Sequence, residues 1–185
     1  MSQKLAFLAS DADVARDAHV RLVQMYGSVD LDQADIIVAL GGDGFMLQTL
    51  HATQHLDAPV YGMNRGTVGF LMNAYEEDGL IDRLSAAEEA EINPLSMTAV
   101  DVEGHEFSAL AINEVSLLRA LIPKASHVDF EVIDPKKRPV MADADSRSFA
   151  NVARVSVKSE TDVVHRLLFD PGHGLDERLI REQFV

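Results

Sequence analysis

The chain has 185 residues, of which 47% are hydrophobic, enough apolar material for one compact domain or two small lobes. It contains no cysteine, which excludes disulfides, thiolate metal sites and cysteine nucleophiles and argues against zinc chemistry. The formal net charge of −14 disfavours non-specific attraction to nucleic acid or anionic membranes, so a phosphate-bearing ligand would need local attractions: backbone amides, a helix dipole, a divalent cation or a few basic side chains.

The first half of the chain alternates short apolar strands with amphipathic helices. Strands are expected over residues 4–9, 35–40 and 58–62, and helices over residues 12–25 and 45–55. Because these strands are apolar throughout, they predict a parallel sheet that helices cover on both faces. The segment 76–90, rich in Glu, Ala and Leu, predicts a further helix or helix pair that ends before Pro94. Residues 1–92 are therefore predicted to form a Rossmann-like parallel α/β lobe.

From Leu95 onward the pattern changes to alternation interrupted by turns. Residues 97–102 and 107–118 flank Glu103-Gly104 and predict a β-hairpin, and the alternation returns at 127–133 and 152–157. We expect residues 93–170 to form an antiparallel β-rich lobe and residues 171–185 a helical tail. The predicted fold class is thus α/β, with a parallel α/β lobe followed by an antiparallel β-rich lobe.

The most informative motif follows the second predicted strand and reads Gly41-Gly42-Asp43-Gly44. Glycines let the backbone approach a ligand closely, and the start of a helix adds a positive dipole end, so the turn suits an anion. A bare carboxylate there would repel phosphate unless it shares a metal or accepts a hydroxyl proton, which indicates phosphoryl transfer. The alternative is that Asp43 only caps a helix beginning at Phe45.

A second candidate site lies on the apolar stretch 107–118. Asn113 and Glu114 are neighbours on this predicted strand, so their side chains should point to opposite faces and at least one needs a polar partner inside. A ribose hydroxyl or a base edge would satisfy that side chain. The alternative is a hairpin-edge pair that faces water.

Three segments, in this order, resemble the NAD kinase family: 41–44 (Gly-Gly-Asp-Gly), 62–71 (Gly-Met-Asn-Arg-Gly-Thr-Val-Gly-Phe-Leu) and 111–117 (Ala-Ile-Asn-Glu-Val-Ser-Leu). The first alone is also similar, more distantly, to the turn of lipid kinases and phosphofructokinases. The resemblance covers residues 1–119 well and 123–185 more loosely. It implies transfer of the γ-phosphoryl of ATP, or of polyphosphate, to the 2′-hydroxyl of the adenosine ribose of NAD, which makes NADP.

The resemblance also implies roles for individual residues. Asp43 would be the catalytic base, Glu114 would accept hydrogen bonds from ribose hydroxyls and Asn113 would bind the nucleotide. Asn64 belongs to a turn whose Arg65 brings a positive charge near the phosphates or is only solvated. The implied nucleotide-binding set is Gly41, Gly42, Asp43, Gly44, Gln48, Asn64, Asn113, Glu114 and Asp145, with no metal ligand from the protein.

Two members of that set depart from the family pattern. Gln48 stands where the family often has a basic side chain that meets phosphate, so this position keeps an N–H hydrogen-bond donor but has no positive charge. Asp145 stands where the family often has an Asp-Gly-Gln turn, but Ser146 and Arg147 follow it here, and a solvated acidic turn is the simpler interpretation.

A larger departure follows Arg119. Family members usually continue with several strands and a Ser/Thr/Gly/Pro-rich loop containing Thr-Ala-Tyr, whereas this sequence passes directly to a much later part of the pattern. Either a central segment is absent from the printed sequence only, or the protein is genuinely shortened. Losing central strands would leave sheet edges unpaired, which favours the first interpretation.

The remaining expectations concern partners and location. The resemblance implies NAD and ATP as substrates, Mg²⁺ or another divalent cation with the ATP, and a homodimer or homotetramer. The apolar run at residues 5–9 is too short for a signal-peptide core and no run reaches the ~20 apolar residues of a membrane helix, so a cytoplasmic protein without membrane partners is expected. The rival hypotheses are a lipid or sugar kinase with the same glycine-aspartate turn and a non-catalytic NAD(P)-binding protein.

Overall fold

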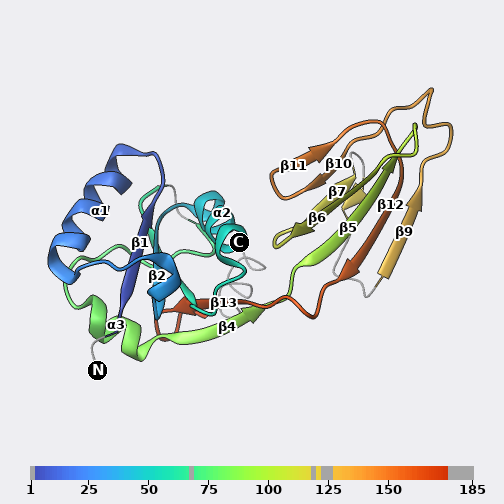
Figure 1. The fold of residues 1–185 in the computed structure, drawn as a ribbon. Coiled ribbons are helices and arrows are strands. Elements are labelled where there is room, and N and C mark those ends of the chain that lie inside the picture. Colours follow the sequence, from blue (N-terminus) through green and yellow to red (C-terminus); the bar gives the residue numbers. More distant parts are fainter. Residues whose placement is uncertain (1–2, 67–68, 118–119, 122–126, 175–185) are drawn as a thin grey trace. The chain divides into compact units, whose positions relative to one another are not determined.

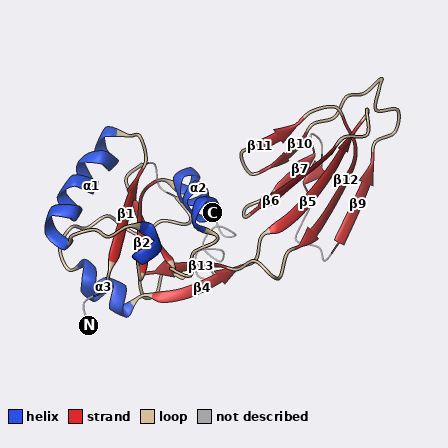
Figure 2. Ribbon diagram, in the orientation of Figure 1, coloured by secondary structure: helices blue, strands red, loops and turns tan. Residues whose placement is uncertain are grey.

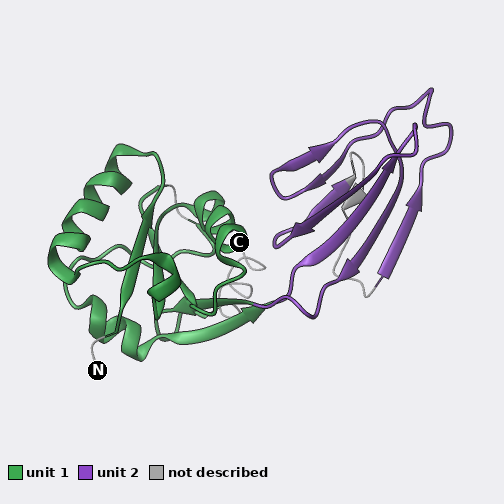
Figure 3. Ribbon diagram, in the orientation of Figure 1, with its two compact units in different colours: residues 1–92, 165–185 green, residues 93–164 purple. Residues whose placement is uncertain are grey.

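The computed structural model describes residues 3–66, 69–117, 120–121 and 127–174 (Figure 1). They divide into two compact units, one formed by residues 1–92 and 165–185 and the other by residues 93–164 (Figure 3). The predicted discontinuity after Arg119 and residues 175–185 of the predicted helical tail lie outside the described residues, and residues 171–172 of that tail form a turn. No helix among the described residues is long and apolar enough to cross a membrane.

A five-stranded sheet forms the centre of the first unit. Its strands, in spatial order, are β1 (Leu5–Ala9), β2 (Ile36–Gly41), β3 (Val60–Asn64), β13 (His165–Phe169) and β4 (Glu88–Ile92). The first four strands are parallel, and β4 pairs antiparallel with β13 at the edge. All six residues of β2 are buried, as expected for a strand that has neighbours on both sides and helices above and below.

Three helices pack on this sheet: α1 (Asp13–Tyr26), α2 (Asp43–Thr53) and α3 (Leu80–Ala86), and a short 3₁₀ helix spans Leu31–Gln33 (Figure 2). Buried residues of α1 and α3, such as Leu22 and Leu84, share one apolar cluster with Val38 and Leu40 of β2. Helix α2 packs against β2 and β3. The parallel α/β character predicted for this part of the chain is therefore confirmed.

The second unit consists of two antiparallel sheets. The first sheet has the strand order β6-β5-β12-β9 and consists of β5 (Leu95–Asp101), β6 (Glu106–Ala111), β9 (His127–Glu131) and β12 (Val152–Ser159). The second sheet has the strand order β11-β10-β7-β8 and consists of β7 (Val115–Leu117), β8 (Ala120–Leu121), β10 (Ala142–Ala144) and β11 (Arg147–Phe149). Residues from both sheets, among them Met97, Val115 and Val155, form one apolar core. The antiparallel β-rich character predicted for this region is confirmed.

Three predicted elements differ from the structure. The helix expected over 76–90 ends at Ala86, because Glu88–Ile92 pairs with β13 as an edge strand. Strand β13 lies within the predicted β-rich lobe 93–170, yet it is hydrogen-bonded in the sheet of the first unit. The strand expected over 107–118 is interrupted at residues 112–114, which form a bend between β6 and β7.

Candidate functional site

The glycine turn lies at the carboxyl end of β2, where α2 begins. Strand β2 ends at Gly41, Gly42 is the extended N-cap residue, and α2 starts at Asp43, two residues earlier than predicted. A Cβ on Gly41 would lie 2.7 Å from Cβ of Phe45, so this glycine is needed for packing. At Gly42 and Gly44 an added Cβ would meet no atom within 4 Å, so the backbone is open at the start of the helix. That openness, together with the helix dipole, is what a phosphate-binding turn requires.

Asp43 does not cap its own helix, although it stands at the first position, since α2 has no side-chain capping bond. Its carboxylate instead accepts two main-chain N–H bonds from a distant segment, from Phe70 to Oδ2 at 2.5 Å and from Leu71 to Oδ1 at 2.9 Å. A Cβ on Gly69 would lie 2.2 Å from Oδ1 of Asp43, so the segment can pass the carboxylate only because residue 69 is glycine. The segment 69–71 therefore fixes the position of the acid.

A second turn packs against the glycine turn. Asn64, the last residue of β3, is the register partner of Gly41, and the Arg65 N–H donates to the Gly41 carbonyl at 2.7 Å. The Asn64 side chain accepts a hydrogen bond from Gly66 N–H at 2.9 Å, and a Cβ on Gly66 would lie 3.6 Å from Gly42 N. The two turns thus form one rigid surface at the carboxyl ends of two neighbouring parallel strands, the usual place for ligands in open α/β sheets.

The two longer polar side chains predicted near this turn behave differently. The Arg65 guanidinium lies over the Tyr75 ring at 4.1 Å, and its Nε donates to the Val14 carbonyl at 3.2 Å. Arg65 is therefore held against α1 and is not simply solvated. Gln48 lies on α2 and is exposed, and its predicted contact with the nucleotide stays a prediction.

Asn113 and Glu114 do not lie on a strand as predicted. Both are exposed and belong to the bend 112–114, so the alternation argument for one inward side chain does not apply to them. The reason for the bend is a carboxylate from a distant segment: Asp145 accepts hydrogen bonds from the N–H groups of Ile112 at 2.8 Å, Asn113 at 3.0 Å and Glu114 at 3.2 Å. The bend presents both polar side chains outward, where a ligand can reach them.

An interlocked polar cluster, which the sequence did not indicate, lies where β3 and β13 stop pairing. The buried Asn73 amide donates to the carbonyls of Gly62 at 3.1 Å and Leu168 at 3.0 Å, and its oxygen accepts a bond from Asp170 N–H at 3.0 Å. The Asp170 carboxylate in turn pairs with Arg83 Nη2 at 2.5 Å and accepts a bond from the hydroxyl of Tyr61 at 2.6 Å.

The titration of this cluster follows from those contacts. Partial burial acts to raise the pKa of Asp170, but the hydrogen bonds from Arg83 and Tyr61 outweigh it and the pKa lies below its ordinary value. Burial, reinforced by the bond to Asp170, raises the pKa of the Tyr61 hydroxyl. Asp170 is therefore a charged structural group of the sheet at neutral pH.

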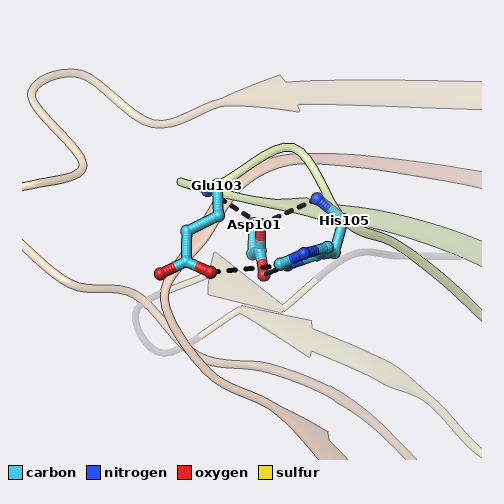
Figure 4. A group of neighbouring side chains, drawn as sticks. All are labelled: Asp101, Glu103 and His105. Atoms are coloured by element: carbon cyan, nitrogen blue, oxygen red, sulfur yellow. Dashed lines mark hydrogen bonds and ion pairs between the residues drawn. The ribbon is translucent and has the colours of Figure 1, made fainter.

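The described residues also contain one cluster with the composition of a cation site, formed by Asp101, Glu103 and His105 on the hairpin between β5 and β6 (Figure 4). The Asp101 carboxylate accepts bonds from the N–H groups of Glu103 at 2.8 Å and His105 at 2.9 Å and contacts the His105 ring at 2.9 Å. The hydrogen bond to Asp101 raises the pKa of His105. These bonds close the hairpin turn, so the cluster needs no ion to explain its arrangement.

The predicted site residues therefore form two groups. Gly41, Gly42, Asp43, Gly44 and Asn64 lie together in the first unit, with Gln48 farther along α2, and Asn113, Glu114 and Asp145 lie together in the second unit. The amides of Phe70 and Leu71 were not predicted as part of the site, although the glycine spacing of 62–71 marks the segment that carries them.

Comparison with known proteins is consistent with this geometry. Residues 3–91 match the family model described as ATP-NAD kinase N-terminal domain. The chain is 47% identical over 251 residues to an NAD kinase of Cereibacter sphaeroides (99% of each chain), 36% identical over 249 residues to one of Caulobacter vibrioides (98% of this chain, 96% of the relative) and 38% identical over 252 residues to one of Xanthomonas campestris (98% of each). Each alignment is longer than the 185 residues of the chain, so the relatives carry residues without a counterpart here.

Proposed function

The chain belongs to the NAD kinase family, and from that premise we propose that it transfers the γ-phosphoryl of ATP to the 2′-hydroxyl of the adenosine ribose of NAD, with Asp43 as the catalytic base. NAD kinases are phosphotransferases with an alcohol acceptor, so NAD and ATP are the substrates. The relatives named above are all NAD kinases, which leaves the lipid- or sugar-kinase alternative without support.

The observation that carries the role of Asp43 is its fixed position beside an open glycine turn. Each carboxylate oxygen accepts one main-chain bond, from Phe70 or from Leu71. A carboxylate oxygen has two lone pairs, so each oxygen keeps capacity for a further hydrogen bond. An alcohol is a poor nucleophile at neutral pH, and a carboxylate fixed within reach of its proton is the group that activates it.

The open backbone at Gly42 and Gly44 supports the position of the phosphates. Their amides stand at the start of α2, where the helix dipole favours negative charge, and an added Cβ at either glycine would meet no atom within 4 Å. Asn64 belongs to the adjoining turn, and Gln48 follows along α2. We assign these residues to nucleotide binding, together with Asn113 and Glu114, whose exposed side chains can bond ribose hydroxyls and a base edge.

A divalent cation is part of the proposal. Asp43 is the single carboxylate of the turn 41–44, which suits an ion held mainly by nucleotide phosphates and water, as Mg²⁺ usually is. Mg²⁺ bound with ATP neutralises phosphate charge, because a chain with a net charge of −14 cannot neutralise it from its own surface. Polyphosphate as an alternative donor, a cytoplasmic location and a homodimer or homotetramer complete the proposal.

The experiment that tests the base is a kinetic comparison of the wild type with Asp43→Asn. Removing a general base lowers kcat by about 10²–10⁴-fold, and we expect a loss of that size in NADP formation from NAD and ATP·Mg²⁺. The matched control is Asp17→Asn, which makes the same chemical change on the exposed face of α1 and should leave kcat unchanged. A kcat for Asp43→Asn within a factor of three of the wild-type value would show that Asp43 is not the catalytic base.

A further inference from the structure

The bend that carries Asn113 and Glu114 is held by a single side chain. Between β6 and β7 the N–H groups of three consecutive residues, Ile112, Asn113 and Glu114, all donate to the carboxylate of Asp145. We call this arrangement of one carboxylate and three amides the amide clamp. The clamp determines the conformation of the bend, because these N–H groups have no partner in a strand.

Asp145 is itself held in place by the fold. It follows the last register pair between β10 and β7, Ala144 with Val115, both of which are fully buried. Its own N–H donates to the Glu114 carbonyl at 3.1 Å, so bonds run in both directions between the bend and the turn 145–146. Its φ of 49° is in the left-handed region, which Asp and Asn adopt more readily than other residues with a side chain.

The chemistry of the clamp requires a carboxylate. Two negatively charged oxygens can accept three N–H bonds, and charge-assisted bonds of this kind are stronger than neutral ones. Oδ1 of Asp145 accepts the bonds from Asn113 and Glu114, and Oδ2 accepts the bond from Ile112. An Asn side chain has no negative charge, and beside its one oxygen it places an NH₂ donor where Oδ2 accepts a bond here. Substitution of Asp145 by Asn therefore keeps the size and the backbone preference, removes the charge and breaks the three-bond clamp.

We infer that Asp145 is a positioning residue for the nucleotide: it holds the bend so that Asn113 and Glu114 present their side chains to the adenosine ribose of NAD, and it acts through the bend. The inference about NAD rests on the proposed function, whereas the clamp does not. A loss of the clamp leaves both ligand-binding side chains in place on a backbone that no longer has one conformation, which weakens NAD binding.

The first experiment measures the clamp without reference to activity. Amide hydrogen exchange by NMR on the full chain should show protection at residues 112–114 falling about tenfold or more in Asp145→Asn, with the amides of β5 and β12 unchanged. The matched control is Asp134→Asn, the same substitution at another left-handed position (φ 55°), exposed and in the same unit. Protection that stays at the wild-type level in Asp145→Asn would overturn the inference.

The second experiment measures NAD affinity by calorimetry and the KM for NAD in the kinase assay. We expect Asp145→Asn to raise the Kd and the KM for NAD about tenfold each, with a smaller change in kcat, and Asp134→Asn to change neither constant. Combined with Asn113→Ala and Glu114→Ala, Asp145→Asn should add nothing, since its effect passes through those two side chains. An additive effect would mean that Asp145 contacts the nucleotide itself. Loss of exchange protection at residues 112–114 with unchanged NAD affinity would mean that the clamp is only structural. Either result overturns the inference.

Failure of the proposed function gives a different pattern. A wild-type chain that neither binds NAD nor forms NADP contradicts both the kinase assignment and the role in NAD binding. The exchange measurement would still show whether the amide clamp exists, so the two failures are distinguishable.

Discussion

At the scale of single residues, Gly69 determines where the Asp43 carboxylate can lie. A Cβ at residue 69 would stand 2.2 Å from Oδ1 of Asp43, so Gly69→Ala must displace either the acid or the segment whose amides hold it. A misplacement of about 1 Å at a reacting group lowers the rate by about 10²-fold, and we expect that loss in kcat for NADP formation.

The control for this substitution is Gly174→Ala. An added Cβ there lies 3.6 Å from a Glu88 side-chain oxygen, an ordinary contact, and we expect wild-type kcat. If Gly69→Ala keeps wild-type kcat while circular dichroism shows a folded protein, the segment 69–71 does not position Asp43.

Much of the site at this scale could be predicted from local sequence, because its chemistry depends on residues next to each other. The glycines around Asp43 lie within four positions, and the end of an apolar strand indicates where they stand in the fold. The partners of Asp43 and Asp145 could not be predicted, since both carboxylates bind main-chain amides about 30 positions away. Every residue except proline has such an amide, so the residue type does not identify the partner. The same long-range bonds explain why Asn113 and Glu114 lie on a bend.

At the scale of elements, Asn73 joins β3 to β13 where their direct pairing ends. The two strands share register only at Val60 with Leu167 and at Tyr61 with Leu168, and the Asn73 amide then bridges the carbonyls of Gly62 and Leu168. Asn73→Leu removes these bonds and leaves buried carbonyls without them, which we expect to destabilise the protein by about 2–4 kcal/mol.

Urea unfolding followed by circular dichroism measures this prediction, with Gln24→Leu on the exposed face of α1 as the control, expected within about 0.5 kcal/mol of wild type. A free energy of unfolding for Asn73→Leu equal to that of the control would show that the two strands do not depend on the bridge.

The order of β1, α1, β2, α2 and β3 could be predicted because short apolar strands and amphipathic helices alternate along the chain. Two strands, β4 and β13, could not be predicted. The sequence Glu-Glu-Ala-Glu-Ile of β4 has the composition of a helix and becomes a strand by pairing with β13. Strand β13 returns to the first sheet after the whole second unit, a non-local pairing that no local pattern shows.

At the scale of the whole molecule, the ion pair of Asp170 with Arg83 in the first unit makes the stability of the protein depend on pH in the acid range. The pKa of Asp170 is lower in the folded state than the value of about 3.9 expected in the unfolded state. Its stabilisation is therefore fully present above about pH 4–5 and is lost as the pH falls through the lower folded-state pKa.

Asp170→Asn should accordingly destabilise the protein by about 3 kcal/mol at pH 7, because Arg83 loses a partly buried partner. The difference in melting temperature between wild type and Asp170→Asn should shrink as the pH is lowered from 5 to 2. A difference that stays constant over that range would contradict the charged state assigned to Asp170.

This chain of 185 residues belongs to the NAD kinase family and is expected to have that activity, although its relatives align over a longer sequence. The most direct measurement is the formation of NADP and ADP from NAD and ATP·Mg²⁺ by purified protein whose mass is verified as 20.3 kDa. We expect NADP and ADP in equal amounts from the wild type and the loss of both products in Asp43→Asn. Folded protein of that mass that binds NAD and forms no NADP would contradict the kinase activity and would indicate a nucleotide-binding protein without turnover.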